Sequence, residues 1–250
     1  MRVVWVLGLM LLLVLLVPPE GSAVAGPTVG SPVGAKASPV TVADWRLDEP
    51  AGSTVMVDSS GRGRHGAVDP GAAAAGLTLE NGVYHWSVRC PACPPTALPR
   101  VVQVPDNADL DIPDPDQRYS ISFRFRSHKG YGNIMQKGQA TTAGGQIKIE
   151  NPKGLTTCVF VGANKSYVSV RGATPLNDGQ WHVVECIHTA AAVSQVVDGV
   201  LVAVKYQRTG PIDNAKPFVI GGKTSCNQVS VTCDYYSGYL DWVMISRGGA

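Results

Sequence analysis

The chain has 250 residues, and 44% of them are hydrophobic, which is enough apolar material to bury a core in one large domain or two small ones. Lys plus Arg number 21 and Asp plus Glu number 19, and this near balance excludes a whole-molecule field that would hold nucleic acid or an anionic membrane. Only 16% of the residues are charged, and 28 glycines and 18 prolines are present, a composition that disfavours coiled coils and long amphipathic helices.

The N-terminus has the features of an export signal. An uncharged apolar run extends from Val3 to Val17, which is short for a membrane span of roughly 20 residues. The small residues of Ala23-Val24-Ala25 then provide the pattern that a signal peptidase requires. We therefore predict a signal peptide over residues 1–25, a secreted mature protein, and no membrane insertion after the signal is cleaved.

The remainder of the chain divides into a linker and one domain. Residues 26–40 are mainly Gly, Pro, Ser, Ala and Val without periodicity, which predicts a flexible linker. From residue 41 to residue 250, short runs of alternating apolar and polar residues are separated by Gly, Asn, Asp and Pro. This spacing predicts an all-β sandwich or barrel.

The clearest alternation lies in Tyr119–Arg126, where Ile121, Phe123 and Phe125 face one side of a strand and polar residues face the other. Asp198-Gly199 is typical of a two-residue type I′ turn between two strands. The other predicted strands are Thr41–Leu47, Val83–Val88, Arg100–Val104, Asn133–Lys137, Gln146–Glu150, Thr156–Val161, Tyr167–Arg171, Trp181–Thr189, Val193–Val197, Val200–Tyr206 and Leu240–Ser246.

Six cysteines in an exported chain predict three disulfides. Cys158 and Cys186 fall in strand-type runs, at a spacing that suits two neighbouring strands. The other four are assigned by locality to the pairs Cys226–Cys233 and Cys90–Cys93. A zinc site built from these same four cysteines is the alternative.

Several segments in chain order carry a family resemblance: Trp45–Gly52, Val57–Gly66, Ala108–Ile112 leading into Ser120–Arg124, Leu176–Val184, Val197–Gly199 and Gly238–Ile245. Together they resemble laminin G-like domains of the concanavalin A-like lectin and glucanase superfamily. Asn133–Gly138 and the paired cysteines are similar to secreted bacterial members of actinobacterial type. The resemblance implies an all-β jelly-roll sandwich of two antiparallel sheets over residues 41–250, with a concave face that receives glycans in many relatives.

The resemblance also implies one structural calcium ion at the rim of the sandwich, and no other cofactor. In such sandwiches a rim metal is often held near the first and last strands. The matching positions in this sequence are Asp48 in Leu-Asp-Glu and Asp241 in Leu-Asp-Trp. We expect backbone carbonyls to complete the calcium shell.

A ligand-binding face is expected where polar side chains alternate off a strand, because they can line a shallow groove that meets sugar hydroxyls. Three tyrosines beside the segment between Cys226 and Cys233 are the preferred aromatic binders, because exposure is expected there. The candidate binding residues are Ser122, Arg124, Arg126, Tyr235, Tyr236 and Tyr239. Strand tryptophans are instead expected in the core: Trp45, Trp86, Trp181 and Trp242.

Motifs for catalysis are missing from the sequence. There is no Gly-x-Ser-x-Gly elbow, no His-Glu-x-x-His and no Glu-x-Asp-x-x-Glu strand. His182, Glu185 and His188 have the spacing of a helical metal site, but a strand would place Glu185 on the opposite face from the histidines. A hidden carboxylate pair of Glu150 and Glu185 on adjacent strands is the remaining catalytic candidate.

We therefore expect a secreted, non-catalytic module that binds carbohydrate or a glycosylated partner at the cell surface. Two alternatives stay open. One is an extracellular adhesion or structural protein that binds protein, and the other is a glycan-cleaving enzyme on the same fold.

Overall fold

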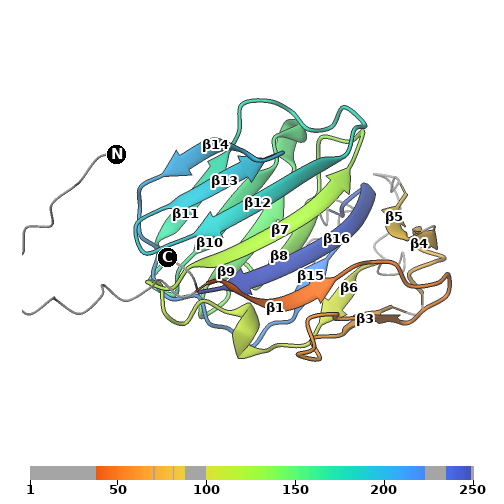
Figure 1. The fold of residues 1–250 in the computed structure, drawn as a ribbon, viewed down its shortest axis with the longest axis horizontal. Helices are drawn as coiled ribbons and strands as arrows, with labels where there is room; N and C mark the ends of the chain where they lie inside the picture. Colours follow the sequence, from red (N-terminus) through yellow and green to blue (C-terminus); the bar gives the residue numbers. More distant parts are fainter. Residues whose placement is uncertain (1–37, 70, 81, 88–99, 223–234, 249–250) are drawn as a thin grey trace, which may run out of the picture. The chain divides into compact units, whose positions relative to one another are not determined.

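The computed structural model describes residues 38–69, 71–80, 82–87, 100–222 and 235–248, and their strands form two antiparallel sheets (Figure 1). The first sheet has the order β14 (Val200–Lys205), β13 (Val193–Val197), β12 (His182–His188), β7 (Tyr119–Arg126), β16 (Gly238–Arg247), β5 (Val83–Trp86) and β4 (Leu77–Glu80), and β1 (Val40–Trp45) also pairs with β16. The second sheet has the order β11 (Tyr167–Arg171), β10 (Thr157–Val161), β9 (Gln146–Glu150), β8 (Asn133–Lys137), β15 (Phe218–Ile220), β6 (Val102–Val104), β3 (Gly66–Val68) and β2 (Val55–Met56).

The predicted all-β sandwich of two antiparallel sheets is confirmed. Two 3-10 turns, Ala108–Leu110 and Pro152–Gly154, interrupt the connections between strands. Figure 1 shows β12, β7, β16 and β1 side by side in one layer, with β10, β9 and β8 in the layer behind. No helix of the described residues is long and apolar enough to span a membrane.

Strand β7 lies near the centre of the first sheet and follows the alternation that its sequence predicts. Ile121, Phe123 and Phe125 are completely buried between the sheets, whereas Arg124 and Arg126 are half-exposed on the outer side. Burying each of the two phenylalanines stabilises the fold by about 1.5–3 kcal/mol. The same burial fixes the register of β7, because a slip of one residue would turn the arginines into the core.

Two of the four strand tryptophans lie in the core as predicted. The Trp45 indole N–H donates to the Arg64 carbonyl at 2.7 Å, and the Trp86 indole N–H donates to the Arg100 carbonyl at 2.8 Å. Each buried indole therefore has its polar atom satisfied. The prediction is wrong for Trp181 and Trp242, which are half-exposed on the outer face of the first sheet.

A disulfide joins Cys158 and Cys186, as predicted, with their Cα atoms 5.7 Å apart. The expected location on neighbouring strands is wrong, because Cys158 lies in β10 of the second sheet and Cys186 in β12 of the first. Both side chains point into the core, so the bond ties the two layers together. The other four cysteines lie outside the described residues, and so their disulfides, or the alternative zinc site, stay predictions: Cys90, Cys93, Cys226 and Cys233.

Candidate binding face

A line of side chains crosses the outer face of the first sheet. On this face Arg126 of β7 is paired with Tyr239 of β16, and Tyr239 is paired with His85 of β5. Trp181, which directly precedes β12, lies on the other side of Arg126. Because cross-strand partners have their Cβ atoms about 4.5–5.5 Å apart, their side chains form a continuous contact row. We call Trp181, Arg126, Tyr239 and His85 the aromatic row.

The members of the aromatic row are tightly stacked. The rings of His85 and Tyr239 are nearly parallel, with centroids 4.1 Å apart. The Arg126 guanidinium carbon is 4.3 Å from the Tyr239 ring centroid and 4.9 Å from that of Trp181. Each such cation–π contact is worth about 0.5–1 kcal/mol at an exposed site. The row is therefore ordered by its own contacts while its side chains remain half-exposed.

Arg124, two residues before Arg126, adds a second cation to this face. Its guanidinium carbon is 4.6 Å from the Trp181 ring centroid, and its Nη1 donates to Asp241 Oδ2 at 2.5 Å. The two arginines thus share Trp181, but only Arg124 has an acidic partner among the described residues. Ser122 lies further along the same side of β7, opposite Met244 and Glu185.

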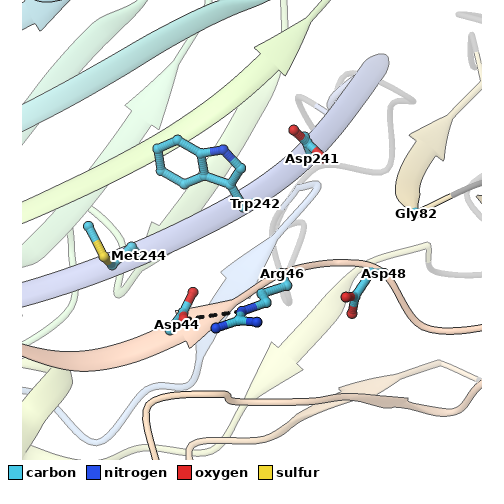
Figure 2. Close-up of a pocket in the computed structure, with 7 residues that line it drawn as sticks. All are labelled: Asp44, Arg46, Asp48, Gly82, Asp241, Trp242 and Met244. Atoms are coloured by element: carbon cyan, nitrogen blue, oxygen red, sulfur yellow. Dashed lines mark ion pairs between the residues drawn. The ribbon is translucent and has the colours of Figure 1, made fainter.

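Two hollows flank the row on this face. The smaller one, the basic pocket, has a volume of about 170 Å³. Its lining residues are Arg126, Tyr239, His85, His128, Lys129, Trp86, Ser127, Ser237 and Gly238. The larger one, the acidic groove, has a volume of about 450 Å³ and is shown in Figure 2. Its lining residues are Asp44, Arg46, Asp48, Gly82, Asp241, Trp242 and Met244.

A β-bulge in β16 creates the acidic groove. The pairing of β16 with β7 shifts register between Leu240 and Trp242, so that Asp241 and Trp242 are both half-exposed although they are consecutive. A bulge inserts one residue and re-aims the side chains that follow it. Trp242 therefore turns outward, which strict alternation from Leu240 does not predict.

The predicted binding residues separate into two groups. Ser122, Arg124, Arg126 and Tyr239 come together on the outer face of the first sheet. Tyr235 lies apart from them, because its backbone bridges Asn133 of the second sheet and its ring contacts Arg100. Sequence reasoning missed His85 as a member of the site, although the alternation of β5 places it outward between two buried aromatic residues.

Tyr236 is wrong as a binding residue, because it is completely buried. Its hydroxyl shares its one proton between the carbonyls of Arg126 and Tyr239, at 3.2 and 3.1 Å, and its ring packs edge-on against Trp86. Burial raises the pKa of the Tyr236 hydroxyl well above its usual value. The side chain supports the basic pocket from below and does not reach a ligand.

The two expected calcium ligands line the same groove. Asp48 and Asp241 both border the acidic groove, together with Asp44 (Figure 2). Asp44 pairs with Arg46 at 3.5 Å, and Asp241 pairs with Arg124. Among the described residues, no three metal-ligating side chains gather closely enough to hold an ion. Calcium takes six to eight oxygen ligands, so the described carboxylates supply only part of a site, and calcium binding stays a prediction.

His182, Glu185 and His188 separate as expected for a strand. Glu185 faces outward and pairs with Arg118 at 2.9 Å, whereas His188 is completely buried beside Thr209. Both ring nitrogens of His182 face carboxylates, Nδ1 at 2.8 Å from Asp198 and Nε2 at 3.1 Å from Asp178. Partial burial opposes the charged form, but these two hydrogen bonds outweigh it and raise the pKa of His182. When it is protonated, the ring donates to both carboxylates and so holds two loops together next to Trp181.

The candidate catalytic pair does not form. Glu150 lies in β9 of the second sheet, where it pairs with Lys148 at 2.5 Å. Glu185 lies in β12 of the first sheet. The expectation of adjacent strands is wrong, because the two glutamates belong to different layers of the sandwich.

Residues 100–248 match a laminin G-type family model described as the concanavalin A-like lectin/glucanases superfamily. Among curated proteins, none matches the chain significantly. The chain spans about a third to a half of the length of the first solved structures that it matches. One of them, domains LG4-5 of the mouse laminin alpha1 chain, is 17% identical with a TM-score of 0.46, over 53% of this chain and 36% of that one.

Two further solved structures cover more of the fold. Domain 4 of an extracellular arabinanase from Geobacillus stearothermophilus, in complex with arabinotriose, is 15% identical with a TM-score of 0.55, over 84% of this chain and 94% of that one. Botulinum neurotoxin type C, which depends on interaction with two ganglioside molecules to enter cells, is 13% identical with a TM-score of 0.55, over 82% of this chain and 47% of that one. At these identities the likeness shows the fold alone.

Proposed function

The chain belongs to the concanavalin A-like lectin/glucanases superfamily, and from this premise we propose that it is an extracellular module that binds carbohydrate through the aromatic row. The disulfide between the two sheets is typical of proteins from oxidising compartments. The arabinanase domain has been solved in complex with arabinotriose, and the neurotoxin interacts with two ganglioside molecules, which supports a binding role in general. The carbohydrate ligand is the part that this proposal adds.

One observation carries the proposal: half-exposed rings lie in a row with two arginines on a rigid strand surface. Sugar rings have apolar C–H faces that stack on aromatic side chains, and their hydroxyls accept hydrogen bonds from guanidinium groups. Trp181 provides the stacking surface, and Arg124 and Arg126 both contact it. Tyr239 lies between Arg126 and His85 and holds the Arg126 guanidinium in place. Because these side chains already pack on one another, little ordering is needed when a ligand binds.

A glycan array followed by isothermal titration with the best ligand tests this function. We expect Trp181→Ala to weaken binding by about tenfold, since one stacking contact is worth about 0.5–1.5 kcal/mol beyond the buried area. Tyr239→Ala should also weaken binding, because it removes the ring that holds the Arg126 guanidinium in place. Tyr167→Ala is the matched control, because Tyr167 is an exposed strand tyrosine of the second sheet.

Two outcomes would contradict the proposal. One is the failure of every carbohydrate to bind. The other is an equal loss of affinity in Tyr167→Ala and in the two variants of the row. Retained binding to enzymatically deglycosylated cell walls would favour protein recognition instead.

A further inference from the structure

Arg126 is held differently from its neighbour Arg124. The two arginines are two residues apart on β7 and point to the same side, and both contact Trp181. Arg124 forms an ion pair with Asp241, whereas Arg126 forms none with any described carboxylate. The rings of Trp181 and Tyr239 hold the Arg126 guanidinium in place, and a ring neutralises none of its charge.

The basic pocket next to Arg126 is lined by further basic residues. Its lining includes His85, His128 and Lys129, and it includes no carboxylate. The volume of about 170 Å³ equals that of five or six water molecules at about 30 Å³ each, which is room for a carboxylate and the ring carbons beside it. A guanidinium fork matches a carboxylate in a planar, two-pronged geometry.

The charges around His85 favour an anion as the ligand of the basic pocket. Burial lowers the pKa of His85 below its usual value, and although Glu80 opposes this effect, the positive charges of Arg126 and Arg100 add to it. His85 is therefore neutral at pH 7 and stacks on Tyr239 as an uncharged ring. The excess positive charge in this region lies on Arg126 and Lys129.

Resting on the proposed function, we propose that the module is specific for acidic glycans: Arg126 binds the carboxylate of an acidic sugar residue in the basic pocket while the sugar ring stacks on Trp181. The basic pocket adjoins the aromatic row through Arg126, Tyr239 and His85, which belong to both. One sugar residue can therefore reach both features at once.

The test is an array in which each acidic oligosaccharide is printed beside its own carboxyl-reduced form, with galacturonate, glucuronate and sialic acid series included. We expect the acidic member to bind at least tenfold more tightly than its reduced partner at fixed ionic strength. In Arg126→Gln the preference should fall to about twofold, and in Arg126→Lys to an intermediate value, because lysine keeps the charge but loses the fork. Arg171→Gln removes one exposed positive charge from the second sheet and should keep the full preference.

The outcomes separate the two proposals. Equal affinity for the acidic and reduced members overturns the acidic specificity and leaves carbohydrate binding intact, whereas no binding to either overturns both. Tighter binding of a sulfated glucan oligosaccharide than of any carboxylated one overturns the assignment to a carboxylate. Unchanged thermal melting of Arg126→Gln shows that a lost preference does not come from unfolding.

Discussion

The basic pocket and the acidic groove lie next to each other on one sheet face, but their charged side chains differ in whether they form ion pairs. In the groove, Asp44 and Asp241 each have an arginine within ion-pair distance. In the pocket, Arg126 is held by two aromatic rings and by no described carboxylate. The chain as a whole has a formal charge of only +2, so this contrast arises from local strand pairing and not from composition.

A charged side chain is available to an oppositely charged ligand only where the fold places no opposite charge beside it. Arg124 and Arg126 have the same chemistry and the same strand. The bulge in β16 brings Asp241 to Arg124, whereas the regular pairing before the bulge brings Tyr239 to Arg126. A one-residue irregularity in the partner strand thus separates a neutralised arginine from an available one.

The largest expected effect is on stability, and it distinguishes Tyr236, which is buried beneath the basic pocket, from Tyr239, which lines the pocket. Tyr236→Ala should cost about 3–5 kcal/mol of unfolding free energy, because it leaves a cavity in the core and removes the hydroxyl under the pocket. Tyr239→Ala should cost less than about 1 kcal/mol, since its ring is half-exposed. Urea unfolding of both variants measures the difference, and similar losses would mean that Tyr236 is not a core residue.

The next prediction removes the ion pair that distinguishes Arg124 from Arg126. Asp241→Asn frees Arg124 from its ion pair, and we expect acidic oligosaccharides to bind two- to fivefold more tightly, in line with about 0.5–1 kcal/mol for a partly exposed charge. Asp48→Asn removes the same charge from the groove without touching Arg124 and is the control. A gain of equal size in both variants would point to general electrostatic attraction.

A smaller effect follows the titration of His85. Because burial holds the pKa of His85 below its usual value in the folded protein, His85 gains its positive charge beside Arg126 only in acidic solution. We expect acidic oligosaccharides to bind a few times more tightly at pH 5 than at pH 7.5. Titrations of His85→Gln should show a flatter pH profile, and an unchanged profile would exclude His85 from the anion site.

The smallest effect concerns the acidic groove and the calcium ion that the family resemblance implies there. A calcium ion bound by Asp48 and Asp241 must compete with Arg124, so we expect chelation to lower the melting temperature by only a few degrees. The shift should vanish in Asp48→Asn. A melting temperature that does not respond to chelation in the unchanged protein would remove calcium from the groove.

Local patterns in the sequence were sufficient for the longer strands and for part of the site. The alternation of Tyr119–Arg126 placed Arg124 and Arg126 on one outward face, because successive side chains of a strand point to opposite sides. Asp198 and Gly199 both have positive φ, as the predicted type I′ turn requires. The short strands β2, β3, β4 and β15 were not predicted, because two to four residues carry too little pattern and form only against neighbouring strands.

Amino-acid order alone thus determined the class of fold and the outward side of β7. It also predicted the pairing of Cys158 with Cys186, but for two neighbouring strands of one sheet. Only the tertiary structure decided that this disulfide spans the two sheets, that Tyr236 is buried, and that Trp181, Tyr239 and His85 surround Arg126 in one row. The physical reason is that successive side chains of a strand alternate between its two faces, so the sequence of one strand shows which residues share a face. Which strand lies beside it, and at which residue a bulge shifts the register, depends on contacts between segments far apart in the chain.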